Sequence, residues 1–242
     1  MNLAKDCVDI GLRTNQLDSM LEFWTCEVGL QYEEMLKVGN GIHQHRLSLN
    51  GSTLKLNHSR DPLPDIPVGG YRELLIASDV DVVKHLTDPD GNRVTLVPWQ
   101  HEGISHIAMR ISVSSLPKAR LFYSRTLLAE PVADNVFRLG TTLLILQESE
   151  ERVGYGRFAG KGYRYLTIRV NKVDVEHLGL LERGARQARR PETLGATARL
   201  SFVTDPDGNW IGLSQRASLT GDLAPERQIR TRFAKADLGL SQ

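Results

Sequence analysis

The hexapeptide Thr-Asp-Pro-Asp-Gly-Asn occurs twice in this chain, at residues 87–92 and at residues 204–209. Each copy runs into a short segment of alternating apolar residues, which is the pattern of a β-strand. Asp-Gly and Gly-Asn favour a tight turn with positive φ, so we interpret the hexapeptide as a hairpin turn and not as a catalytic group. A repeated motif of this kind predicts a tandem duplication.

The similarity between the two halves extends well beyond the hexapeptides. The Gly-Tyr-Arg segment at 70–76 matches 162–168, and an amphipathic helix predicted over 17–24 matches 116–123. The period-2 strand Asp-Ile-Gly-Leu-Arg-Thr at 9–14 is matched with His-Ile-Ala-Met-Arg-Ile at 106–111. Each copy therefore begins with a strand and a helix, followed by strands that include a hairpin at Asn50-Gly51 and at Gly140.

The copies differ in their second halves. Residues 71–88 leave room only for a strand and one short turn of helix, whereas 163–205 also hold a helix near 175–182 and a strand near 199–203. The predicted domains are 1–98, whose second module is truncated, and 104–216. The polar tail 217–242 is predicted to be a solvated helix or packing arm, with a lid or dimer contact as the alternative.

Composition limits the classes of partner. The formal net charge is +1, which argues against nucleic acid or an anionic membrane as the main partner. The two cysteines, Cys7 and Cys26, provide neither a disulfide framework nor a zinc ribbon. No apolar run approaches the roughly 18 residues that span a bilayer, and the start of the sequence lacks the pattern of a secretory signal. We therefore expect a soluble cytoplasmic protein.

A strand-helix-strand-strand-strand module used four times, with the hexapeptide turning into the last strand of a pair, resembles the vicinal oxygen chelate superfamily. That superfamily includes glyoxalase I, methylmalonyl-CoA epimerase, extradiol dioxygenases, fosfomycin-resistance enzymes and bleomycin-binding proteins. The resemblance covers residues 7–215. It implies an α+β fold in which tandem βαβββ modules form two cup-shaped mixed-sheet domains. It also implies metal ligands from the first, fourth, opening and last strands of a cup.

Carried over to this sequence, the resemblance assigns the metal to His106, Gln147 and Glu73, the last only if the modules pair crosswise between the copies. The short join at 98–103 favours pairing within each copy. The last-strand position, normally a glutamate, holds Thr95 and Gly212. Neither copy has the two-histidine, one-carboxylate set of iron-dependent ring cleavage. The cofactor is thus one divalent ion, with iron, manganese, zinc and nickel not distinguished, or no metal at all.

The second cup is the predicted ligand pocket. His106 is expected there as a metal ligand or acid-base group, together with Tyr165 as a second catalytic residue. The alternative for His106 is an ordinary hydrogen-bonded histidine. An aromatic pocket with a cation suits a small oxygenated or aromatic anion, although the same residues could merely fill the cup. The residues predicted to contact the substrate are Arg110, Gln147, Tyr163 and Trp210.

Three functions remain open at this point, and we expect the first of them. The first is a glyoxalase-like or dioxygenase-like enzyme, a lyase, isomerase or oxygenase, acting on a small oxygenated or aromatic metabolite with an atypical metal site. The second is a metal-free binding or sequestration protein of the bleomycin-resistance type. The third is a structural or regulatory descendant with filled cups. A small molecule is the expected partner in the first two, and a homodimer is compatible with all three. His43 and His45 share a strand face without a third ligand, and we interpret them as surface residues of an edge strand.

Overall fold

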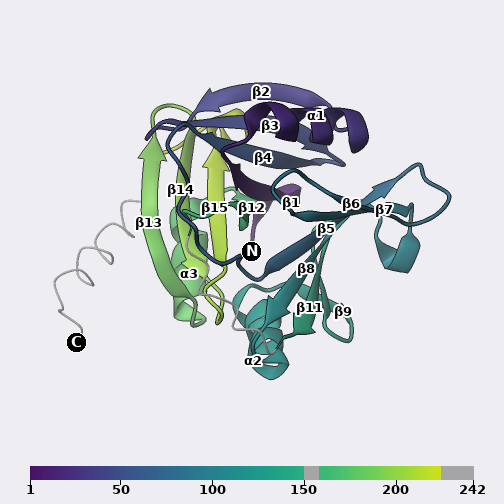
Figure 1. Ribbon diagram of the computed structural model, residues 1–242. Coiled ribbons are helices and arrows are strands. Elements are labelled where there is room, and N and C mark those ends of the chain that lie inside the picture. Colours follow the sequence, from purple (N-terminus) through teal and green to yellow (C-terminus); the bar gives the residue numbers. More distant parts are fainter. Residues whose placement is uncertain (150–157, 225–242) are drawn as a thin grey trace, which may run out of the picture.

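The computed structural model describes residues 1–149 and 158–224 (Figure 1). The described residues form two mixed β-sheets, an eight-stranded first sheet and a seven-stranded second sheet, with short helices packed against them. The predicted α+β fold with cup-shaped mixed sheets is therefore confirmed.

The first sheet contains strands from both ends of the chain. Its order is β13 (Arg186–Leu194), β14 (Ala198–Thr204), β15 (Trp210–Arg216), β12 (Gly162–Val170), β1 (Leu3–Thr14), β4 (Ser52–Ser59), β3 (Ile42–Leu49) and β2 (Tyr32–Lys37). The second sheet contains the middle of the chain. Its order is β6 (Lys84–Thr87), β7 (Arg93–Pro98), β5 (Tyr71–Ser78), β8 (Ile107–Val113), β11 (Thr142–Glu148), β10 (Val136–Leu139) and β9 (Glu130–Ala133).

The modules pair crosswise, so the prediction that each copy pairs within itself is wrong. β1 of the first copy pairs antiparallel with β12 of the second, with Ile10 opposite Leu166. β5 pairs antiparallel with β8 in the second sheet. The short join does not oppose this arrangement, because it connects β7 to β8, which are separated in one sheet only by β5. Two inter-strand spacings are about 10 Å, a gap that a few residues span. The sequence limits 1–98 and 104–216 remain predictions.

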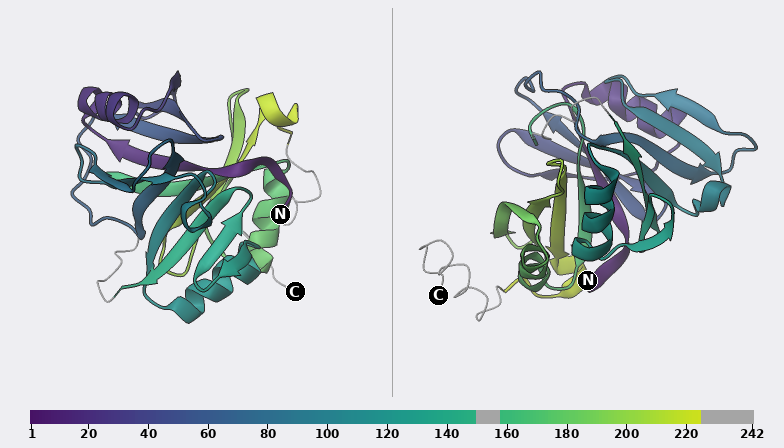
Figure 2. Two further views of the ribbon diagram at one scale, coloured as in Figure 1. Left: turned by 90° about the vertical axis from the view of Figure 1, so that its right-hand side faces the viewer. Right: turned by 90° about the horizontal axis from the view of Figure 1, so that it is seen from below.

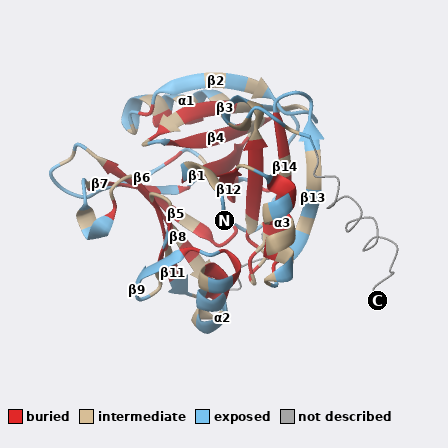
Figure 3. Ribbon diagram, turned by 180° about the vertical axis from the view of Figure 1, so that it is seen from behind, coloured by how far each residue is buried: buried red, intermediate tan, exposed pale blue. Residues whose placement is uncertain are grey.

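The central core lies between the two sheets and beneath the helices (Figures 2 and 3). As its alternation predicted, β1 buries Val8, Ile10 and Leu12 in this core and turns its odd-numbered residues to the other face. The predicted amphipathic helices are also present. They are α1 (Leu17–Glu22) with the π-helical turn η1 (Phe23–Glu27), and α2 (Leu116–Leu121) with the π-helical turn η3 (Phe122–Thr126).

The second half of each copy is partly as predicted. The helix α3 (Val173–Glu182) and the strand β14 confirm the longer second copy. The helical turn predicted between residues 71 and 88 is wrong, because this segment forms the edge strand β6. β6 pairs with β7 across the hexapeptide turn, so strand pairing outweighs any local helical preference. The remaining short helices are η2 (His101–Gly103) and α4 (Ala217–Thr220).

Two sequence expectations concern the periphery of the molecule. Most of the tail 217–242 lies outside the described residues, which end at residue 224, so its role stays a prediction. None of the helices in the described ranges combines the length and apolarity needed to cross a membrane.

The hexapeptides form hairpin turns, as predicted, with φ of +85° at Gly91 and +81° at Gly208. The second hexapeptide also connects distant parts of the chain. Asp205 accepts a hydrogen bond of 2.9 Å from the Asn209 side chain, whose Oδ1 accepts one of 2.7 Å from the buried backbone N–H of Gly70. Asp207 accepts a further hydrogen bond from Ser114 N. The hexapeptide therefore attaches the first sheet to the start of β5 and to the chain that follows β8.

We expect Asn209→Ala to lower the free energy of unfolding by about 2–4 kcal/mol, because it leaves the buried Gly70 N–H without a partner and removes one of the hydrogen bonds to the Asp205 carboxylate. Urea denaturation followed by circular dichroism measures the change. The control is Gln31→Ala, which removes an exposed amide side chain. Equal stability of the two variants would show that the connection contributes nothing to folding.

Candidate functional site

The concave face of the first sheet encloses a cavity of about 550 Å³. Residues from β1, β3, β4, β12, β14 and β15 line it, and the ends of β2 and β13 form part of its rim. Figure 1 shows how this sheet turns from the strands of the first module to those of the last, with β1 and β12 at the turn. Both ends of the chain therefore contribute to one cavity.

One wall of the cavity is a cluster of aromatic rings. Phe158 stacks on Tyr165 with 5.1 Å between ring centroids, and it contacts Phe202 at 5.3 Å and Trp210 at 5.0 Å. Phe158, Tyr165 and Phe202 line the cavity directly. The cluster thus presents flat apolar surface to a bound molecule.

Two glycines make room for this aromatic wall. A Cβ on Gly11 would lie 2.2 Å from the Tyr165 ring, and a Cβ on Gly212 would lie 2.9 Å from the Phe202 ring. Gly212 is the position at which the sequence resemblance led us to expect a glutamate ligand. A glutamate at this position would displace the Phe202 ring. The ring can pack here because residue 212 has no side chain.

The charged lining of the cavity is cationic. None of the described lining residues is a carboxylate. Three nearby carboxylates pair with some of the cations: Asp9, Glu34, which bridges Arg46 and Arg216, and Glu192, which pairs with Arg189. The lining residues with a positive charge are Arg13, Lys37, Arg46, Lys55, Arg169, Arg189 and Arg216.

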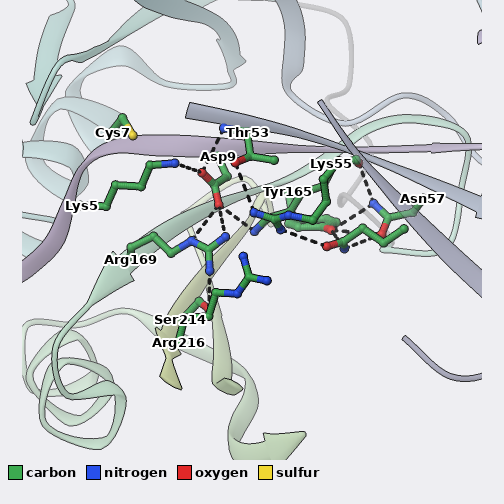
Figure 4. A network of polar contacts seen from close by, with 12 residues as sticks. Lys5, Cys7, Asp9, Thr53, Lys55, Asn57, Tyr165, Arg169, Ser214 and Arg216 are labelled. Carbon is green, nitrogen blue, oxygen red and sulfur yellow. Dashed lines mark hydrogen bonds and ion pairs between the residues drawn. The ribbon is translucent and has the colours of Figure 1, made fainter. Parts of the chain in front are cut away.

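Asp9 on β1 is fully buried and holds several cations (Figure 4). Its Oδ2 lies 3.1 Å from Lys55 Nζ and 2.7 Å from Arg169 Nη2, while Oδ1 lies 3.5 Å from Lys5 Nζ and accepts a 3.1 Å hydrogen bond from Thr53 N. Burial alone would raise the pKa of Asp9, but the charges of Lys55 and Arg169 outweigh it and hold the pKa below its ordinary value. Asp9 is therefore a carboxylate at every physiological pH.

Arg13 lies further along β1 and differs from the other buried cations. It is 8% exposed, and its Nη1 donates a 3.2 Å hydrogen bond to the carbonyl oxygen of Phe158. Its guanidinium carbon lies 5.5 Å from the centre of the Phe158 ring. Within the described part of the chain, no carboxylate pairs with Arg13 and its Nε has no hydrogen-bond partner. Burial lowers the pKa of Arg13, although a guanidinium remains charged.

Of the two predicted catalytic residues, only Tyr165 lines the cavity. Its hydroxyl accepts a 3.0 Å hydrogen bond from Asn57 Nδ2. Burial raises the pKa of Tyr165 to about 12, so the phenol keeps its proton at neutral pH. The phenol can therefore donate a hydrogen bond to a ligand and so orient it. A catalytic role for Tyr165 stays a prediction.

His106 lies at the far end of the second sheet, next to β8, and does not reach the cavity. Its Nδ1 contacts Ser105 Oγ at 3.0 Å, and its carbonyl oxygen accepts a hydrogen bond from Asn50 Nδ2. The sequence match of 106–111 to 9–14 was two residues out of register. Ile10 pairs with Leu54 in one sheet and Met109 with Leu144 in the other, so Asp9 corresponds to Ala108. The alternative of an ordinary hydrogen-bonded histidine describes His106 better.

The three predicted metal ligands do not meet. His106 precedes β8, whereas Gln147 is exposed and pairs with Ser112 near the other end of that strand. Six residues of strand separate these two levels by about 20 Å. Glu73 is occupied by ion pairs, 3.0 Å to Arg110 Nε and 3.2 Å to Arg93 Nη2. Crosswise pairing therefore occurs without assembling the predicted metal site.

The predicted substrate-binding residues are dispersed in the same way. Arg110 and Gln147 belong to the second sheet and do not line the cavity. A register shift between Gly11 and Leu12 turns Tyr163 into the central core, where its hydroxyl donates to Arg93 O. Trp210 contacts Phe158 behind the cavity wall. The cavity has an aromatic and cationic lining, but none of the four residues predicted to contact the substrate belongs to it, and their role in binding stays a prediction.

The described residues do not fit a bound metal ion. They include no group of three or more His, Cys, Asp or Glu side chains that could hold a metal ion. In the first sheet the buried carboxylate is already surrounded by an ammonium and a guanidinium, which would repel a divalent cation. On the equivalent face of the second sheet, Leu75, Ala77 and Ala108 form an apolar cluster, and the carboxylate of Glu73 is already paired with Arg110 and Arg93. We therefore derive no step through a metal.

The prediction that His43 and His45 are surface residues of an edge strand is wrong for His45. β3 lies between β2 and β4, and His45 is buried against Tyr32, whose hydroxyl is 3.1 Å from His45 Nδ1. Burial lowers the pKa of His45. His43 is exposed and pairs across the strands with His58.

Sequence reasoning missed the charged centre of the cavity. Lys55 stands between Leu54 and Leu56, and Arg169 stands between Ile168 and Val170. A charge flanked on both sides by buried apolar residues in a strand signals a polar inner face. Such a signal could have identified both residues without a structure.

Comparison with known proteins shows what this chain is similar to. Residues 103–213 match the family model described as the Glyoxalase/Bleomycin resistance protein/Dioxygenase superfamily. A search of curated protein sequences gives no match. Among solved structures, glyoxalase I from Zea mays has a TM-score of 0.66 at 17% identity and covers 86% of this chain and 92% of its own. A putative dioxygenase from Bacillus subtilis has a TM-score of 0.61 at 10% identity and covers 100% and 97%.

An antibiotic-binding protein, TnmS3 from a Streptomyces species, is 27% identical over 45% of this chain and 93% of its own, with a TM-score of 0.37. The maize and Bacillus structures share the fold with this chain across both halves. The match to the Glyoxalase/Bleomycin resistance/Dioxygenase superfamily thus covers residues 103–213, and the fold of the whole chain is similar to that of the maize and Bacillus structures.

Proposed function

We propose that this protein binds a small aromatic anion in the cavity of the first sheet, without a metal ion. The observation that carries the proposal is Arg13, a buried guanidinium on the cavity wall that has no carboxylate partner among the described residues. A buried charge without a counter-ion costs several kcal/mol. An anionic ligand would supply the missing counter-charge.

The position of Arg13 beside the aromatic wall indicates what else the ligand carries. Its guanidinium lies near the Phe158 ring, which stacks on Tyr165. A ligand whose anionic group contacts Arg13 would place its body against these rings. A flat aromatic ring makes the best use of such a surface. The cavity volume of about 550 Å³ falls within the range of about 300–1,000 Å³ that is typical for small-molecule sites.

This proposal favours the second of the functions expected from the sequence. The enzyme hypothesis placed its chemistry either on a metal held by His106, Gln147 and Glu73 or on His106 acting with Tyr165. The three metal ligands lie apart, and only Tyr165 of the second pair lines the cavity. The cavity does retain groups that could act on a ligand, Tyr165 and Lys55, so turnover is a separate question from binding. A homodimer and a cytoplasmic location stay predictions.

We expect the protein to bind 2-naphthoate and to bind the neutral isostere 2-naphthamide much more weakly. Arg13→Gln should weaken 2-naphthoate binding at least about tenfold, which corresponds to about 1.4 kcal/mol, because it removes a charge-assisted hydrogen bond in a buried site. Isothermal titration calorimetry measures both affinities.

The matched control is Arg125→Gln, which removes an exposed guanidinium on η3, far from the cavity lining. It should bind 2-naphthoate as the unchanged protein does. Equal affinity for naphthoate and naphthamide, or equal binding by the two variants, would refute an anion site at Arg13. Circular dichroism establishes that both variants are folded.

Metal removal gives a second test. Dialysis against EDTA should leave 2-naphthoate affinity unchanged within about twofold. Adding Mn²⁺, Zn²⁺ or Ni²⁺ should not raise the thermal unfolding midpoint. The reason for both expectations is that the Asp9 carboxylate is already ion-paired with Lys55 and Arg169. Elemental analysis of protein purified without a metal-binding tag accompanies the titration. Stoichiometric metal together with loss of binding in EDTA would overturn the metal-free proposal.

A further inference from the structure

Lys55 is a buried amine on the wall of the cavity. It lies on β4 with 5% of its surface exposed, and it lines the cavity together with Asn57 from the same strand. Its Nζ is 6.0 Å from the centre of the Tyr165 ring. A ligand stacked against the aromatic wall would therefore lie close to a primary amine.

The surroundings of Lys55 hold more positive than negative charge. The carboxylate of Asp9 contacts Lys55. The same carboxylate also accepts hydrogen bonds from Arg169, through Nη2 at 2.7 Å and Nε at 2.9 Å. Arg46 adds a further positive charge from β3, and Lys5 approaches Asp9 from its other oxygen. An arginine stays charged in such a site, whereas a lysine can release its proton.

Burial, followed by the charges of Arg169 and Arg46, lowers the pKa of Lys55 to about 7, although Asp9 opposes the shift. A substantial fraction of the amine is then neutral near pH 7. A desolvated lysine next to another cation is the usual setting of an amine that attacks carbonyl groups. The charges around Lys55 and its position on the cavity wall thus both favour an amine that can attack a carbonyl group.

We propose that Lys55 forms a reversible imine with an aldehyde or ketone group of the bound aromatic anion, an inference that rests on the proposed ligand class. The Nζ lone pair attacks the carbonyl carbon, and the carbonyl oxygen takes up a proton to give a carbinolamine. Loss of that oxygen as water, with one further proton taken from solvent and one nitrogen proton released, leaves a protonated imine. One amine, one carbonyl compound and one proton become one iminium ion and one water.

The iminium product suits the site electrostatically. It restores a full positive charge beside Asp9, at the place of the original ammonium. No oxidant or reductant takes part, and the reaction reverses when water returns. The anionic end of the same ligand would contact Arg13, which also contacts the Phe158 ring of the aromatic wall.

The experiment uses the full chain with 4-formylbenzoate and sodium cyanoborohydride, which reduces an imine to a stable secondary amine. Peptide mapping by mass spectrometry measures labelling of each lysine over time at several pH values. We expect Lys55 to be labelled at least about tenfold faster at pH 7 than Lys118, an exposed lysine on α2. Labelling should rise with pH around 7, because only the neutral amine reacts, and 2-naphthoate should protect Lys55.

The variants Lys55→Arg and Lys118→Arg complete the design. Lys55→Arg should lose the fast label, and Lys118→Arg should keep it. If Lys55 is labelled no faster than Lys118 while 2-naphthoate still binds, the imine is excluded and the proposed function stands. If 2-naphthoate fails to bind and Lys55 is not labelled, both proposals fail. The wild-type map alone decides between these results if Lys55→Arg does not fold.

Discussion

The antiparallel pairing of β1 with β12 is the interaction on which the rest of the structure depends. It joins the first strand of one repeat to the opening strand of the other repeat's second half, and it runs along most of both strands. The same pairing places one face of β1 in the central core and the other face, with Asp9, Gly11 and Arg13, over the cavity. Fold and site are therefore consequences of a single strand alignment.

Asp9 shows how a family cup can keep its shape while changing its chemistry. In this chain Lys55 and Arg169 on neighbouring strands neutralise the buried Asp9 carboxylate. These two side chains supply the positive charge that a bound metal ion would bring. On the equivalent strands of the second sheet, part of the face is an apolar cluster and Glu73 is paired with Arg110 and Arg93. The two sheets therefore differ in the chemistry of the same face, because the buried carboxylate of the first sheet corresponds to Ala108 in the second.

The sequence was sufficient for the fold class and most strands, and insufficient for the pairing of the modules and for the site. The repeat, the alternation in β1 and the Asn50-Gly51 turn are local signals, and local signals specify strands and hairpins well. Pairing between modules is not local, and the short join was compatible with both arrangements. His106 was misplaced by a two-residue register error, which keeps the side chain on the same face but moves it along the strand. The ion pair of Asp9 with Arg169 joins residues more than a hundred positions apart, and no spacing rule predicts it.

Crosswise pairing also sets an order of events during synthesis. β1 leaves the ribosome about 150 residues before its antiparallel partner β12. Until β12 emerges, one edge of β1 and the charged side chain of Asp9 have no permanent neighbour on that side. The second sheet, made of the middle of the chain, can form earlier. The cavity is therefore among the last parts of the molecule to assemble, and its formation depends on a long loop closure that slows folding.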